Sequence, residues 1–249
     1  MKRLAILLLA ILVGFSLSAQ ERGNTKIQSF PEAKKILAKL YQNHRVTFYC
    51  GCSYDKKVDH SSCGYQPRKP LNKSGRKNER AYRIEWEHIV PAHAFGQSFR
   101  EWREGDPKCV NKNGKPFKGR KCAETNQLFA RMEADLYNLV PAIGEVNGNR
   151  SNYSMAMIPG EVRRYGACDV EIEGRKIEPR PAIRGDIARI YRYMDAAYPG
   201  HGVISRKNRK LFEAWDKSDP VDEWECERAR MIEKVQGNQN TFVKRKCNR

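Results

Sequence analysis

Eight cysteines constrain this chain more than any other feature, because each disulfide would fix two segments side by side. They are Cys50, Cys52, Cys63, Cys109, Cys122, Cys168, Cys226 and Cys247. Eight cysteines allow 105 pairings, so the sequence does not set the full connectivity. We expect Cys109 to pair with Cys122 and Cys226 with Cys247, since each pair would close one local loop. A zinc site is the weaker alternative, because Cys50 and Cys52 lack the usual two-residue spacing and no histidine pair completes a ligand set.

The first 19 residues predict export. They begin with Lys2 and Arg3, continue as an apolar run and end in small residues at Ala19, as a cleaved secretory signal does. A membrane anchor is the alternative, but the run is shorter than the roughly 20 residues that a span needs. We therefore expect residues 20–249 to form a single domain, secreted or periplasmic, with no membrane segment. Disulfides persist in such oxidising compartments.

The chain is strongly basic, with 47 Lys and Arg against 29 Asp and Glu. Its formal charge of +18 becomes +16 once Lys2 and Arg3 leave with the signal peptide. This excess favours a polyanionic partner, namely nucleic acid, an anionic envelope polymer or a membrane surface. A solvated basic surface without a specific partner remains open on charge alone.

The hydrophobic spacing predicts an α+β fold, mainly helical with short strands, in one domain with a sizeable core. Strand-like composition marks EWEHIVP, which Pro91 stops, and YNLVPA, after which Pro141 is expected to open a helix through IGEVNGNRSN. Loops are expected at 49–80, stapled by disulfides, and at 103–121, which is long and basic. Helices are expected at 29–44 with Ser29 as its cap, and at 124–135, 185–198, 206–218 and 222–236.

The segment EWEHIVPAH (85–93) crowds two carboxylates and two imidazoles into a strand, where unpaired buried charge is costly. Glu87 offers a carboxylate to a hard cation such as Mg²⁺. A neutral His88, with an ordinary pKa near 6.5, can take a proton from water. Consecutive strand residues point to opposite faces, so both can serve one site only if the backbone twists or bends. The alternatives are that Glu87 pairs with an arginine and that His88 is a hydrogen-bonded core residue.

The downstream segment GEVNGNR adds candidate oxygen ligands. Asn is a poor helix former, so a helix that accepts Asn147 and Asn149 among glycines suggests a use for these side chains. Asn-Gly is also a strong turn signal, and turn formation is the alternative.

These segments resemble the exported bacterial endonuclease I nucleases of the ββα-metal (His-Me finger) group. The resemblance rests on FYCGC (48–52), SCGYQPRK (62–69), EWEHIVPA (85–92), GRKC (119–122), MEADLYNLVPAIGEVNGNRSN (132–152) and WECERARMIEKVQGNQN (224–240). It implies a disulfide-stapled ββα-metal finger and a Mg²⁺-dependent endonuclease, with Mn²⁺ or Ca²⁺ as substitutes. The implied substrates are DNA and RNA, cut with little sequence preference to 5′-phosphate products. We expect a monomer.

By position, the resemblance gives Glu87 and Asn147 as metal ligands, His88 as the general base and Arg120 as the arginine that stabilises the phosphate. The loop before Arg120 is longer than in the family, so this residue keeps its neighbours but not its distance from His88. Four more residues are candidates for supporting the site or the fold, namely Glu85, His93, Glu133 and Glu145.

Two other function classes fit parts of the sequence. A non-catalytic nucleic-acid-binding protein would account for the charge, but it has no need for Glu87 beside His88. A secreted disulfide-rich structural protein would account for the cysteines but not for the basic excess.

Overall fold

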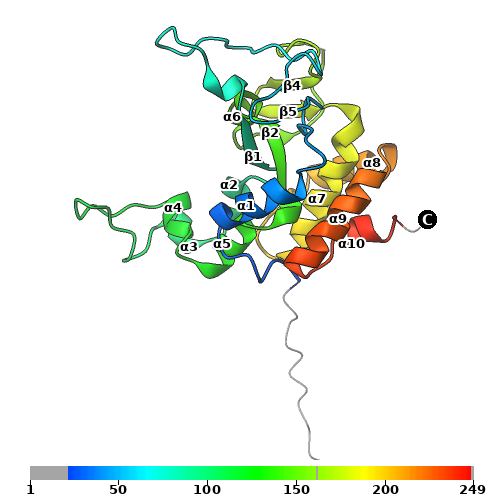
Figure 1. Cartoon of the computed structure of the whole chain (residues 1–249). Coiled ribbons are helices and arrows are strands. Elements are labelled where there is room, and N and C mark those ends of the chain that lie inside the picture. The colour runs from blue at the N-terminus through cyan, green and yellow to red at the C-terminus, as the bar shows by residue number, and fades with distance from the viewer. Residues whose placement is uncertain (1–21, 161, 248–249) are drawn as a thin grey trace, which may run out of the picture.

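A computed structural model describes residues 22–160 and 162–247. Short helices and strands occupy most of the first half, and longer helices follow in the second half (Figure 1). The arrangement confirms the α+β class. The predicted signal peptide, residues 1–19, lies outside the described residues. None of the helices in the described ranges combines the length and the apolar character that crossing a bilayer requires.

The elements have the following bounds in chain order: α1 (Phe30–Leu40), η1 (Glu79–Ala81), β1 (Ile84–His88), α2 (Ala92–Gly96), α3 (Arg100–Arg103), α4 (Arg120–Ala123), α5 (Gln127–Glu133), η2 (Leu136–Asn138), β2 (Leu139–Ile143), α6 (Gly144–Arg150), β3 (Ser154–Met155), β4 (Val170–Glu173), β5 (Lys176–Pro179), η3 (Pro181–Ile183), α7 (Arg184–Ala197), α8 (Asn208–Ser218), α9 (Glu223–Gln236) and α10 (Thr241–Lys244).

Capping side chains set the ends of the predicted helices. Ser29 caps α1 as expected, accepting a hydrogen bond from the Glu32 amide. The helix predicted at 124–135 is instead α5, which begins later because the Asn126 side chain accepts hydrogen bonds from the first amides of that helix. The short α4 precedes it. Asp222 caps α9, and Gly237 ends it in the left-handed conformation with φ of 89°.

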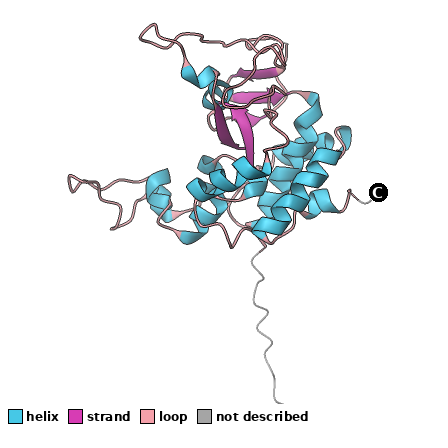
Figure 2. Ribbon diagram, in the orientation of Figure 1, coloured by secondary structure: helices cyan, strands magenta, loops and turns pink. Residues whose placement is uncertain are grey.

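The helices α7, α8 and α9 form a layer on one side of the molecule (Figure 2). Buried Arg189 of α7 joins them through ion pairs with Asp186, Asp216 and Glu225. A buried guanidinium requires several acceptors to replace its lost hydration, so this cluster fixes how the three helices meet. Buried apolar side chains from this layer continue into one cluster that reaches α1 and the β1–β2 pair.

The antiparallel strands β1 and β2, followed by α6, hold most of the candidate site. Trp86 lies opposite Pro141, and His88 opposite Leu139. The prediction that Pro141 opens the helix is wrong, because Pro141 lies within β2 and α6 begins at Gly144. Proline is tolerated there because the sheet has only two strands, so its missing amide removes no bond to a third strand.

A second sheet, in the order β3-β5-β4, was not predicted. Its strands contain two or four residues, too few for a clear period-two pattern. The β4–β5 connection uses Gly174 and Arg175, both with positive φ (55° and 60°). Arg175 is a non-glycine residue in this conformation, which sequence patterns do not favour.

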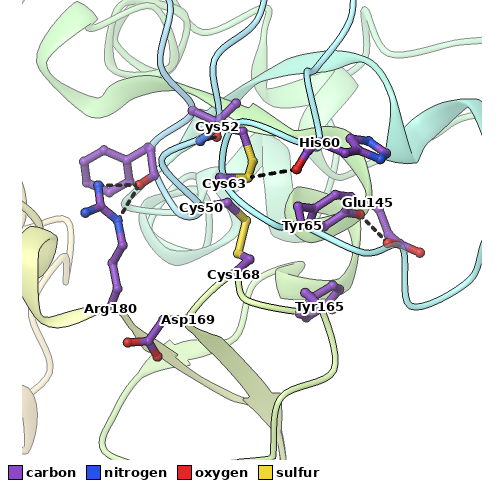
Figure 3. Close-up of a disulfide and its surroundings, with 12 residues drawn as sticks. Cys50, Cys52, His60, Cys63, Tyr65, Glu145, Tyr165, Cys168, Asp169 and Arg180 are labelled. Atoms are coloured by element: carbon purple, nitrogen blue, oxygen red, sulfur yellow. Dashed lines mark hydrogen bonds between the residues drawn. A yellow bond between two sulfur atoms is a disulfide. The ribbon is translucent and has the colours of Figure 1, made fainter.

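Four disulfides join all eight cysteines. The structure pairs Cys109 with Cys122 and Cys226 with Cys247, as expected from sequence. Two further disulfides lie close together (Figure 3): Cys50–Cys168 joins the 49–80 segment to the chain just before β4, and Cys52–Cys63 closes a loop within that segment. With every thiol oxidised, a cysteine-ligated zinc site is excluded.

The disulfides should differ in their contribution to stability. Replacing Cys50 and Cys168 by alanine removes a link across 118 residues and should lower the free energy of unfolding by about 4–5 kcal/mol. Replacing Cys109 and Cys122 opens a link across 13 residues and should cost about 3 kcal/mol. Guanidinium unfolding of the two double variants measures the difference. An equal or reversed order would contradict the assignment of Cys50–Cys168 as the main long-range link.

Candidate active site

A cleft of about 740 Å³ lies among β1, α6, α1 and α4. Its walls include Glu87, His88, Arg120 and Asn147, the four residues that the sequence analysis selected for catalysis and metal binding. The pair from β1, the asparagine from α6 and the arginine that begins α4 therefore meet, although they are far apart in the sequence. All five residues of β1 line the cleft, so Glu87 and His88 both border it although they are adjacent in the strand.

Arg150 of α6 fixes the position of Glu87. Its Nη1 donates to Glu87 Oε1 at 2.9 Å and to the His88 carbonyl at 2.7 Å, and its Nη2 donates to the Ile89 carbonyl at 2.6 Å. The Tyr49 hydroxyl donates to the same Oε1 at 3.1 Å. Burial raises the pKa of the Glu87 carboxyl, and the Arg150 guanidinium opposes that rise. The arginine pairing considered from sequence is therefore present, and it occupies only one carboxylate oxygen.

His88 is held as a neutral imidazole with a defined tautomer. Its Nε2 lies 2.8 Å from the Glu133 carbonyl oxygen. A carbonyl only accepts, so Nε2 carries the proton and Nδ1 keeps a lone pair. The pKa of His88 is lowered to about 3, with burial as the largest cause, and the nearby Arg120 charge lowers this pKa more than the Glu133 hydrogen bond raises it. The Phe30 ring packs beside the imidazole with centroids 4.7 Å apart.

Arg120 reaches the cleft despite the longer loop before it. Its Nε forms an ion pair with the Glu133 carboxylate, and its guanidinium carbon lies 5.4 Å from the centroid of the Phe30 ring. Glu133 therefore serves both cationic and neutral neighbours, since its carboxylate holds Arg120 and its carbonyl orients His88. Burial raises the pKa of the Glu133 carboxyl, and Arg120 opposes this rise.

Asn147 is oriented by Glu85. The Asn147 Nδ2 donates to Glu85 Oε2 at 3.0 Å. Arg80 and Arg83 in turn hold the Glu85 carboxylate through contacts of 2.6–2.9 Å. Burial raises the pKa of Glu85, but the hydrogen bonds and the positive charges of the two arginines together outweigh it and leave the pKa lowered. A fixed Nδ2 also fixes the direction of the Asn147 amide oxygen, because the amide is planar.

The glycines of α6 leave room for this arrangement. A Cβ at Gly148 would lie 2.3 Å from Arg80 Nη1, and a Cβ at Gly144 would lie 2.8 Å from Glu85 Oε1. Both distances are shorter than non-bonded atoms tolerate. The glycines that weaken the helical pattern in the sequence therefore allow the Arg80–Glu85 pair to approach α6 closely.

The other polar candidates have separate positions. His93 lines the cleft and meets Trp102 edge to face at 5.8 Å. Asn149 donates to the Tyr165 hydroxyl at 2.8 Å and is not among the cleft residues. Glu145 is buried and accepts hydrogen bonds from the Tyr65 hydroxyl, a contact visible in Figure 3, and from two backbone amides of the 66–78 loop.

The donors in the cleft fit a hard divalent cation. Mg²⁺ is commonly held by one or two protein oxygens and several waters. Glu87 has a second carboxylate oxygen besides the one that Arg150 and Tyr49 contact, and Asn147 has an amide oxygen. In the described part of the chain, no three His, Cys, Asp or Glu residues gather in a cluster of the kind that holds a metal through protein ligands alone.

Sequence reasoning did not assign Arg80, Arg83 and Arg150 to the site. Arg80 and Arg83 lie five and two residues before Glu85. The chain turns between η1 and β1, so this spacing does not by itself predict that the side chains meet. Arg150 follows the paired asparagines, where a basic residue at the end of a helix is ordinarily explained by the helix dipole. Only the tertiary structure turns its side chain inward against β1.

One family model and three relatives show which known proteins this chain is similar to. A family model described as Endonuclease I matches residues 24–247. The chain is 44% identical to a periplasmic deoxyribonuclease of Aeromonas hydrophila over 248 residues, which cover 96% of this chain and 93% of the relative. It is 40% identical to endonuclease-1 of Buchnera aphidicola subsp. Acyrthosiphon pisum (strain APS), covering 94% and 88%. An extracellular ribonuclease of Bacillus subtilis (strain 168) is 34% identical over 126 residues, covering 44% and 43%.

The Arg150–Glu87 contact gives a stability prediction. Arg150→Met should lower the free energy of unfolding by about 3–5 kcal/mol, because it leaves a buried carboxylate without its charged partner. Adding Glu87→Gln should recover about 1–3 kcal/mol, since the uncompensated charge is then gone. Urea unfolding of both variants tests this. Strictly additive losses in the double variant would show that the pair is not energetically coupled.

Proposed function

Because the chain belongs to the endonuclease I family, we propose that it acts as an exported metal-dependent endonuclease on DNA, and also on RNA. The observation that carries the proposal is the state of His88, a neutral imidazole whose free Nδ1 shares a cleft with a carboxylate, an amide oxygen and a guanidinium. The periplasmic and extracellular relatives support export. The ribonuclease relative supports RNA as a second substrate.

His88 acts as the general base in this proposal. Its Nδ1 takes a proton from the attacking water while Nε2 stays bonded to the Glu133 carbonyl, which holds the ring in place as charge develops. The hydrogen bond to the Glu133 carbonyl, which favours the protonated ring, stabilises the positive charge that forms. General-base catalysis of this kind contributes about 10²–10⁴-fold to a rate.

Arg120 offsets the negative charge that gathers on the phosphorus centre. Its Nε is committed to Glu133, so its terminal amino groups are the ones that face a phosphate in the cleft. A guanidinium fixed in advance stabilises the transition state without reorganising during the reaction.

Glu87 and Asn147 would hold the divalent cation, within the ββα unit that β1, β2 and α6 form in this proposal. The chemistry that Mg²⁺ supplies when bound is polarisation of a phosphate oxygen and stabilisation of the departing 3′-oxygen. The product then carries a 5′-phosphate. Contacts to phosphates carry no direct sequence information, which fits cleavage with little sequence preference.

Plasmid nicking tests the function. The wild-type protein should cut supercoiled DNA in Mg²⁺ and stop in EDTA, and His88→Ala should lower the rate by about 10²–10⁴-fold. His201→Ala is the matched control, because His201 stacks on Phe99 outside the cleft and should retain the rate. Binding of DNA without any cutting in Mg²⁺ would replace the proposal with a non-catalytic binding function. Equal cutting in EDTA would show that cleavage does not depend on a metal ion.

Metal binding tests the role of Glu85. Glu85→Gln should weaken Mn²⁺ binding by about 10–100-fold, because the amide no longer holds Arg80 and Asn147 in the same arrangement. Gly148→Ala should act in the same direction by displacing Arg80. Calorimetry or Mn²⁺ spin resonance measures affinity without any turnover, and exposed Glu79→Gln is the control. Unchanged affinity in both variants would mean that Asn147 is not positioned in this way.

A further inference from the structure

Two basic loops extend from the body of the molecule to the same side, one above α6 and one beside α4 (Figure 1). We call residues 66–78 the first arm and residues 107–119 the second arm. The first arm contains five Lys and Arg residues and the second contains four lysines, and neither contains an acidic residue. Each arm is far more basic than the chain as a whole.

The two arms end in the same turn. The sequences are LNKSGR (71–76) and VNKNGK (110–115). In each, the Asn side chain accepts hydrogen bonds from the amides two and four residues later, at 2.9–3.1 Å. Gly75 and Gly114 follow with φ of 71° and 73°. The repeated turn therefore presents a lysine and a second cation in the same way at both tips.

Most cations of the arms are available to a ligand; Lys77 instead lies over the Tyr82 ring, with its Nζ 3.7 Å from the ring centroid. Among the described residues, none of the nine Lys and Arg side chains of the arms forms an ion pair. The apolar side chains beside them are also exposed, with Leu71 at 58% and Val110 at 47%. Lysines without acidic neighbours repel one another, which costs stability unless a polyanion neutralises them.

Both arms are attached to the candidate active site. Amides of Arg68 and Lys69 donate to the Glu145 carboxylate at 3.0 and 2.8 Å, and Glu145 lies on α6 two residues before Asn147. The second arm is closed by Cys109–Cys122 and leads directly into Arg120. The first arm is therefore joined to the α6 side of the cleft and the second arm to the α4 side.

From this placement we propose that the two arms grip duplex DNA on either side of the cleft, each tip neutralising phosphates some distance from the bond to be cut. The proposal rests on the proposed nuclease function and adds to it the surface that binds the substrate. Each arm is closed by hydrogen bonds across its turn, and the second also by a disulfide. Two such pre-ordered arms suit a stiff duplex, whose phosphates keep a regular spacing, better than a flexible single strand.

Matched triple variants test the proposal. The first-arm variant is K69Q/K73Q/R76Q, the second-arm variant is K112Q/K115Q/K118Q, and the control is K207Q/K210Q/K217Q. The control removes the same charge from exposed lysines at or near α8, which lies away from the arms (Figure 1). Binding to a duplex of about 30 base pairs is measured in EDTA from low to moderate salt, because each phosphate contact adds about 0.9 to the salt slope.

Each arm variant should lower affinity for the duplex by about 10-fold or more and should reduce the salt slope by about 2–3. The control should keep nearly the wild-type affinity and the wild-type salt slope. The loss should shrink with shorter duplexes that no longer reach the arms, and should be smaller for single strands. Equal losses in the control, or arm variants that bind the duplex like wild type, would overturn the proposal. A wild-type protein that binds with the full slope but does not cut would overturn the nuclease function instead.

Discussion

The contact between Arg150 and Glu87 is the interaction on which the rest of the site depends. It joins the last residue of α6 to the centre of the cleft, and the same guanidinium holds the carbonyls of His88 and Ile89. The helix that carries Asn147 is thereby locked to the strand that carries Glu87 and His88. A buried pair of this kind contributes little net stability, but its geometry excludes other arrangements. Its value here lies in placing three functional groups together.

Contacts around Glu85 and Glu133 also use an ion pair to hold functional groups in place. Each carboxylate binds an arginine and also fixes a neutral group, which is Asn147 for Glu85 and, through the backbone carbonyl, His88 for Glu133. Ion pairs between arginine and carboxylate are well suited to this role because the guanidinium offers donors in a fixed plane. The cleft is therefore built from groups whose orientation is set before any substrate arrives.

Much of the fold could be predicted from sequence because it rests on local signals. Ser29 and Asp222 mark helix starts through their caps, and the helices of the second half follow hydrophobic spacing. The β3–β5–β4 sheet could not be predicted, since strands of two to four residues leave no period to count. Pro141 was misplaced because proline suits both a helix start and an edge of a short sheet.

The residues of the candidate site likewise fall into those that the sequence predicts and those that it does not. Glu87, His88, Arg120 and Asn147 could be selected because their motifs are long, and the structure brings all four into one cleft. Arg150 and Arg80 could not, because their roles depend on which way a helix end and a turn face after folding. The glycines of α6 gave a hint, since Gly148 in a helix is unfavourable unless something large lies against it, and Arg80 does.

Cleavage by the proposed mechanism depends most directly on where the cation binds. Crystals of the protein soaked in Mn²⁺ would show the ion by its anomalous scattering. The prediction is one ion ligated by Glu87 and Asn147, with a water within hydrogen-bonding reach of His88 Nδ1. An ion held by Glu85 or Glu133 instead, or a cleft that binds no Mn²⁺ at concentrations where the protein cuts DNA, would contradict it.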